Sequence, residues 1–153
     1  GATYGVAKGV TLHSVRVADC VGAGSVSNLI AGIDWVTANH VKPAVANISL
    51  STSSTTSLDE AVTRSINAGV LYTIAAGDQQ STACHRSPGR VPAALTVGAS
   101  DATDARYLYS NSDSCLDLYA PGVDIPSAWS TSDNSATLRI PCTRAAPTAA
   151  PRR

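Results

Sequence analysis

The sequence predicts an α/β fold, a parallel sheet with helices on both faces. Short apolar segments of strand length alternate along the chain with longer segments whose apolar residues recur at helical spacing. The connections between these segments are short, and alternating strands and helices with short connections form a parallel sheet wrapped by helices. The 153 residues suffice for one domain with an apolar core, since 44% of them are hydrophobic.

The first half of the chain predicts two strands and a helix. A strand is expected at residues 11–17, where apolar and polar residues alternate. The glycine-containing turn 22–24 leads into a helix. Its buried stripe is Val26, Leu29, Ile30, Ile33 and Val36. Residues 44–50 are mostly apolar, which is typical of a central strand, and a polar loop follows at residues 51–56.

The second half predicts another helix and three strands. Ser57–Glu60 has the pattern of a capping box and predicts the start of the helix. Gly69 is expected to end it in the left-handed conformation. Further strands are expected at residues 70–75, 94–99 and 116–120.

Charge and cysteine spacing narrow the class of protein. The 11 basic and 11 acidic side chains give a formal net charge of +0, which indicates neither nucleic acid nor an anionic membrane as partner. No apolar run reaches the length of a membrane span. The four cysteines form no C-x-x-C pattern, so a zinc or redox motif is not indicated. Low charge and widely spaced cysteines are typical of exported, disulfide-containing proteins, and we expect a secreted monomer.

Ligands bind beyond the carboxyl ends of strands in such sheets. The loops concerned follow Val17, Leu50 and Ala75. Gly22–Gly24 resembles part of a dinucleotide-binding fingerprint, but position 27 is Ser and Asp34 lies inside the predicted helix. A nucleotide-binding α/β domain is therefore a weakly supported alternative, and an ordinary strand-to-helix turn is the simpler interpretation.

Two aspartates occupy positions that need an explanation. Asp78 follows the small residues at the end of strand 70–75, where it can face a ligand or simply belong to a turn. Asp117 lies between apolar residues, where a carboxylate needs a partner, either a cation or one of Arg90 and Arg106. No Gly-x-Ser-x-Gly elbow is present. The residues alone therefore indicate an exported α/β domain with a ligand site at the strand ends.

An ordered set of segments resembles the subtilases of the proteinase K group. The segments are Thr3–Lys8, Val15–Val17 with Asp19 and Cys20, Ile30–Val36, Asn47–Leu50, Ala75–Gly77, Ser87–Pro88, Val91–Ser100 and Asp117–Trp129. The resemblance covers residues 1–133 and is specific because the whole set occurs in family order. It implies a subtilisin-like fold, incomplete in this chain, and hydrolysis of peptide or protein substrates by an Asp, a His and a Ser.

The resemblance also implies that the triad is absent. The family's Asp and His precede the segment matched by Thr3–Lys8, so they would lie before Gly1. Its Ser belongs to a Gly-Thr-Ser-Met-Ala-x-Pro-His motif, where this chain has Pro141–Thr148. We therefore expect residues 1–133 to be the central part of a peptidase domain and residues 134–153 to be a divergent tail, rich in Pro, Ala and Arg, that does not join the core.

The resemblance implies a fragment or decayed copy of a secreted subtilisin-like serine endopeptidase, inactive by itself. A frameshift near Thr137 would explain the tail. The alternative is a non-catalytic module that holds a peptide in the subtilase groove. Reading the encoding DNA would separate the two, because a one-base shift restoring Gly-Thr-Ser-Met would indicate a fragment.

The resemblance assigns substrate-binding positions. The segment that pairs with extended substrate is Gly22, Ala23, Gly24, Ser25 and Val26. The walls of the pocket for the residue before the scissile bond are Ser49, Leu50, Ala76 and Gly77. Ser51 stands where the family usually has Gly, so we expect a narrowed pocket.

Asp78 occupies the position of the family's oxyanion-hole Asn. An ionised Asp has no hydrogen-bond donor and repels the developing oxyanion. The loss of one such donor costs about 2.7–4 kcal/mol of transition-state stabilisation.

A calcium site and one disulfide are also implied. Asp117 matches a calcium ligand, with the carbonyls of Pro92 and Ala94 as the other protein ligands, and oxygen ligands suit calcium. Cys84 and Cys115 match a family disulfide, whereas Cys20 matches half of a second bridge whose partner lies near the missing His.

Overall fold

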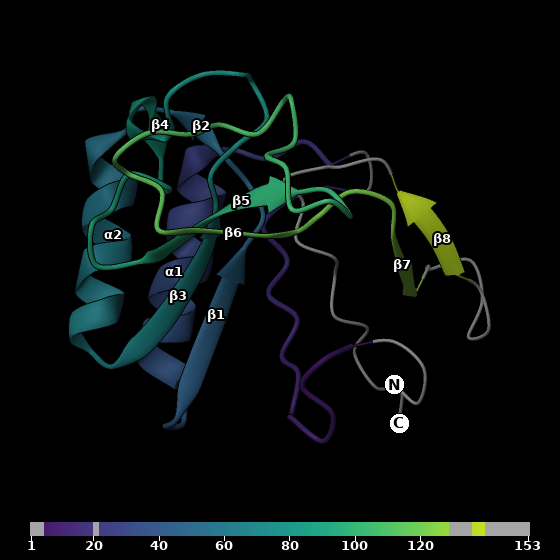
Figure 1. Ribbon diagram of the computed structural model, residues 1–153. Coiled ribbons are helices and arrows are strands. Elements are labelled where there is room, and N and C mark those ends of the chain that lie inside the picture. The colour runs from purple at the N-terminus through teal and green to yellow at the C-terminus, as the bar shows by residue number, and fades with distance from the viewer. Residues whose placement is uncertain (1–4, 20–21, 129–135, 140–153) are drawn as a thin grey trace.

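The computed structural model describes residues 5–19, 22–128 and 136–139. Its centre is a four-stranded parallel sheet in the order β1-β3-β5-β6 (Figure 1). The strands are β1 Ala44–Ile48, β3 Val70–Ala75, β5 Leu95–Ser100 and β6 Leu118–Pro121. The helices are α1 Val26–Asn39 and α2 Thr56–Asn67. The predicted parallel sheet with packed helices is therefore confirmed.

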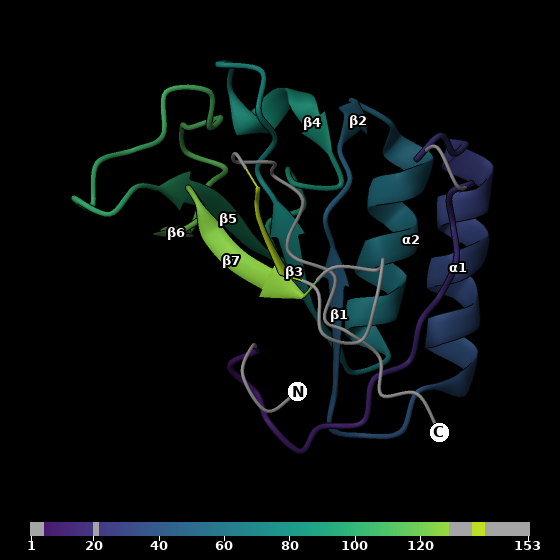
Figure 2. The same cartoon turned by 90° about the vertical axis from the view of Figure 1, so that its right-hand side faces the viewer.

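Both helices lie on the same face of the sheet (Figures 1 and 2). Beneath them is a core of aliphatic residues and one tyrosine. Its buried members are Ile33, Ile48, Leu58, Ala61, Val62, Val70, Tyr72, Ile74, Val91 and Ala94. The second helical layer, expected on the other face, is not formed by the described residues.

Two small antiparallel pairs accompany the sheet. The strand β2 (Thr52–Ser53) pairs with β4 (Arg86–Ser87), next to the short 3-10 helix η1 (Ala83–His85). The strand β7 (Ile125–Ala128) pairs with β8 (Ala136–Arg139) on the side of the sheet away from the helices (Figure 2). Residues 136–139 belong to the segment expected to be a divergent tail, and they form a strand because β7 supplies them with a hydrogen-bonding partner.

Residues 11–17 do not form the predicted strand. The segment packs on α1, because a Cβ added to Gly32 would lie 2.5 Å from Val17 Cγ1 and 3.2 Å from Val15 Cγ1. No strand of the described residues pairs with it. A strand requires a hydrogen-bonded neighbour, so the alternating pattern produces no ladder here.

The predicted central strand lies at the edge of the sheet. Among the described residues β1 pairs with β3 alone. The side chains of Ala46 and Ile48 point toward the core, whereas Val45 is 67% exposed. The strand itself is confirmed, but the predicted central position is wrong for the described sheet, in which β1 lies at an edge.

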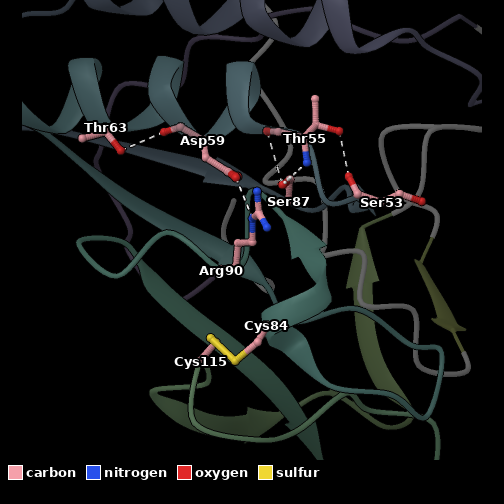
Figure 3. A network of polar contacts seen from close by, with 8 residues as sticks. All are labelled: Ser53, Thr55, Asp59, Thr63, Cys84, Ser87, Arg90 and Cys115. Carbon is pink, nitrogen blue, oxygen red and sulfur yellow. Dashed lines mark hydrogen bonds and ion pairs between the residues drawn. A yellow bond between two sulfur atoms is a disulfide. The ribbon is translucent and has the colours of Figure 1, made fainter.

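The start of α2 differs from the predicted capping box. The helix begins at Thr56 with Thr55 as N-cap, and Ser57 lies inside the first turn. The amide of Thr55 donates to Ser87 Oγ at 2.8 Å, which fixes the start of the helix against β4 (Figure 3). The predicted left-handed Gly69 after the helix is confirmed, with φ 105°.

Polar contacts fasten α2 to the loop after β4. Arg90 Nε donates to Asp59 Oδ2 at 2.7 Å, and both side chains are partly buried (Figure 3). Cys84 and Cys115 form a disulfide with their Cα atoms 5.1 Å apart, which confirms the pairing. The bridge joins η1 to the segment that enters β6, 31 residues later. Cys20 and Cys142 lie outside the described residues.

Candidate substrate-binding site

The carboxyl ends of β1 and β3 bring two predicted pocket walls together. The strands are parallel and in register at Ile48 and Ile74, so the residues that follow them leave the sheet side by side. Ser49 and Leu50 continue from β1, and Ala76 and Gly77 from β3. This is the edge at which ligands bind in parallel sheets.

A hollow of about 200 Å³ lies between the start of α1 and the segment after β1. Its lining residues are Val17, Ala18, Gly22, Gly24, Ser25, Val26, Leu29, Leu50, Ser51 and Thr52. Aliphatic side chains form half of the lining, and the hydroxyl groups of Ser25, Ser51 and Thr52 lie on both sides of the hollow. Of the predicted substrate-binding residues, Ala23, Ser49, Ala76 and Gly77 are not part of this lining, and the other six are.

The loop before α1 has a tight, hydrogen-bonded form. The amide of Asp19 donates to Ala23 O at 2.8 Å, and the amide of Ala23 donates to Asp19 Oδ1 at 2.8 Å. Gly24 has no room for a side chain, because an added Cβ would lie 2.7 Å from Val17 O. Ser25 then caps α1 by accepting a hydrogen bond from the Asn28 amide at 3.1 Å.

The loop that carries Asp78 is organised by a residue that the sequence analysis did not identify. Asp78 is exposed and accepts a hydrogen bond from Gln79 Nε2. Asn111, from the loop before β6, is fully buried, and its side chain binds Ala76, Gln79 and Ser81. No sequence pattern marks an asparagine in a polar loop as buried, so composition gave no signal for it.

Asp117 lies beside the segment predicted to complete a calcium site. Its Oδ2 accepts from the Thr96 amide at 2.6 Å, and its own amide donates to Thr96 O at 2.9 Å. The carboxylate is exposed. The competing salt bridge is wrong for the described residues, since Arg90 pairs with Asp59 and Arg106 donates to Ser110 O and Ser112 Oγ.

The described residues contain no cluster of three or more His, Cys, Asp or Glu side chains that could hold a metal ion. A calcium site built from one carboxylate and two carbonyls does not depend on such a cluster. Within the same residues, no helix is long and apolar enough to cross a membrane.

Comparisons with known proteins agree with this geometry. The sequence profile described as "Subtilase family" matches residues 2–148. The extracellular serine proteinase of Thermus sp. (strain Rt41A) is 60% identical over 135 residues, which cover 88% of this chain and 33% of that protein. Alkaline serine exoprotease A of Vibrio alginolyticus is 50% identical over 129 residues, which cover 84% of this chain and 24% of that protein.

A solved structure matches as well. A cold-adapted subtilisin-like serine proteinase superposes with a TM-score of 0.90 at 44% identity, covering 96% of this chain and 53% of that one. The parallel sheet and its helices therefore form part of a subtilisin-like fold. The chain belongs to the subtilase family, and it spans a quarter to a third of the length of the two relatives named above.

Proposed function

We propose that this chain is the central part of a secreted subtilisin-like serine endopeptidase and that it forms the substrate-binding side of the active site. One observation carries the proposal. Residues 11–17 pack on α1 without a strand partner among the described residues, although their pattern is that of a strand with neighbours, and β1 is an edge strand of the described sheet. A further strand from the rest of the domain between residues 11–17 and β1 would satisfy both.

The proposal requires the catalytic residues to come from polypeptide other than these 153 residues. The chain contains no Gly-Thr-Ser-Met motif, and its resemblance to the family leaves no position for the catalytic Asp and His. The purified chain should therefore leave a fluorogenic peptide uncut above the buffer rate, whereas the complete gene product should cut it. Turnover by the chain alone, blocked by a serine-directed inhibitor, would refute the assignment.

A peptide-binding module without catalysis is the second candidate. The hollow of about 200 Å³ favours it, because described residues of this chain form the hollow without help from any other segment. Its aliphatic lining would take one side chain of an extended peptide. Saturable binding of an uncleaved peptide with an aliphatic residue, lost in Leu50→Asp, combined with an inactive complete gene product, would favour this module over the peptidase.

Calcium is the proposed structural cofactor, held by Asp117 and the carbonyls of Pro92 and Ala94. The donors fit the ion because they are all oxygen, and Asp117 is exposed while the Thr96 amide holds one of its oxygens in place. If the ion binds only the folded chain, millimolar calcium must raise the melting temperature by mass action. Asp117→Asn should abolish this increase, and Asp101→Asn, on another exposed loop, should keep it. An unchanged melting temperature in the wild-type chain would contradict the site.

A further inference from the structure

The side chain of Asn111 uses all of its hydrogen-bonding capacity on one loop. Its Nδ2 donates to Ala76 O at 2.9 Å and to Gln79 Oε1 at 3.0 Å. Its Oδ1 accepts from the Gln79 amide at 3.0 Å and the Ser81 amide at 2.9 Å. An asparagine amide has two donor hydrogens and two acceptor lone pairs, and all four are engaged here. The side chain is fully buried, so each lost contact leaves a buried polar group unpaired.

The loop that Asn111 binds contains two residues with positive φ angles. Gly77 has φ 99° and Gln80 has φ 50°, and a left-handed conformation is uncommon for a residue such as glutamine. Such conformations persist when the surroundings over-determine them. A Cβ added to Gly77 would lie 2.4 Å from Asn111 Nδ2, so the asparagine amide occupies the space that a side chain at position 77 would need.

Asp78 lies between the residues that Asn111 fixes. On one side, the Asn111 backbone amide donates to Gly77 O at 2.9 Å. On the other side, both the amide and the side chain of Gln79 bind the Asn111 side chain. Asp78 itself is exposed and its carboxylate binds Gln79 rather than Asn111, so any effect of Asn111 on the side chain at position 78 is transmitted by its neighbours.

We propose that Asn111 is a positioning residue, which holds residues 76–81 so that the side chain at position 78 points at the carbonyl oxygen of a bound substrate. The inference rests on the proposed function, in which position 78 belongs to the oxyanion site. Aspartate at position 111 would lack both donors, and serine would be too short to reach both sides of the loop.

The first test measures amide hydrogen exchange in the 153-residue chain. In Asn111→Ala, the amides of Gln79 and Ser81 should exchange at least about tenfold faster, because they lose their acceptor. Amides of β3 should keep their protection. The control is Ser65→Ala, which removes an equally buried polar group that binds Tyr72 at 2.8 Å and should leave the two loop amides unchanged. Unchanged exchange at both loop amides in Asn111→Ala would overturn the proposal.

The second test uses the complete peptidase. Asp78→Asn restores an oxyanion donor and should raise kcat by about 10²–10³-fold. Adding Asn111→Ala should remove most of this gain with KM changed less than about threefold, since an interaction made in the transition state is lost. Ser65→Ala should keep the gain. A gain that persists in Asn111→Ala would overturn the positioning role. If every variant is inactive while the exchange result holds, the proposed function fails and the fixing of the loop stands.

Discussion

The two faces of the four-stranded sheet differ sharply in how well they are covered. On the helix side, Val70, Tyr72 and Ile74 are at most 3% exposed. On the opposite side, Val45 and Leu71 are each 67% exposed and Leu95 is 42% exposed. The strand β3 supplies residues to both sets, because successive side chains point to opposite faces.

This difference shows that the strands are apolar on both faces, although the described residues cover only one face. Strands that are aliphatic on both faces occur in parallel sheets buried on both sides. A contiguous exposed apolar patch marks an interaction surface. The structural relative has nearly twice the length that this chain matches, so polypeptide is available in the family to cover such a face. The exposed face therefore supports the proposal that the peptidase is completed by other polypeptide.

Shortening one side chain to alanine on each face of the sheet should give the largest difference in stability between two variants. Ile74→Ala should lower the free energy of unfolding of the chain by about 2–5 kcal/mol, because it leaves a cavity beneath the helices. Leu71→Ala, three residues earlier in the same strand but on the exposed face, should cost less than about 1 kcal/mol, because little apolar area is buried there. Urea denaturation measures both values. Equal losses would show that the exposed face is covered in solution.

The two edges of the sheet also differ, since a disulfide lies beside only one of them, and removing the disulfide tests this difference. Cys84–Cys115 fastens the segment that enters β6, whereas no disulfide among the described residues fastens β1. The double variant Cys84→Ser, Cys115→Ser should lose about 2–4 kcal/mol, since the unfolded chain gains the freedom of a loop of about 30 residues. Reduction of the wild-type chain by dithiothreitol should shift the urea midpoint similarly. A midpoint unaffected by both treatments would mean that the bridge does not constrain the unfolded chain.

The sequence predicted the helix-covered part of the fold better than the rest. Periodicity placed both helices and the strands β1 and β3, because local patterns and the core agree there. It failed at residues 11–17, because a strand depends on a neighbour that its own sequence cannot supply. It also failed at Ser57, because the contact that sets the helix start comes from Ser87, 30 positions further along the chain.

The candidate site was also predicted only in part. The substrate-binding residues were predicted from segments that resemble a known family, and six of these ten residues line the hollow. The predicted pairing of Cys84 with Cys115 came from the same source and is confirmed. Asn111 was missed because its role arises from burial and from partners that lie 30 to 35 positions earlier in the chain.

Polar substitution on the exposed face should have a small effect in this chain and a large one in the complete protein. Val45→Thr with Leu71→Thr should change the free energy of unfolding of the chain by less than about 1 kcal/mol, because exposed positions tolerate substitution. The double variant should also bind less of a hydrophobic fluorescent dye than the wild-type chain does. In the complete protein, the same pair should cost several-fold more, because buried polar groups without partners are penalised. The matched control is Leu108→Thr, a substitution of a 61% exposed residue outside the sheet.

The smallest expected effect is on stability at acid pH, and it arises in the loop beside the disulfide. Hydrogen bonds from the Ser114 amide at 2.7 Å and from Thr82 Oγ1 at 2.8 Å lower the pKa of the Asp113 carboxyl below its ordinary value of 3.8, with a smaller contribution from His85. The unfolded chain therefore binds this proton more tightly than the folded chain. The resulting stabilisation is present above about pH 3.8 and is lost as the pH falls through the folded-state pKa.

Asp113 is fully exposed, so solvent screens the effect and the change in stability should be modest. Asp113→Asn should differ from the wild type most near neutral pH, and the difference should shrink below about pH 3.8. Urea midpoints measured at several pH values give the comparison. The contacts of Asp113 involve Thr82 and Ser114, the neighbours of the bridged segment, so the acid loss should loosen the β6 side and leave the helix-covered face unchanged. A stability difference that is constant from neutral to acid pH would show that the carboxylate contributes nothing through its charge.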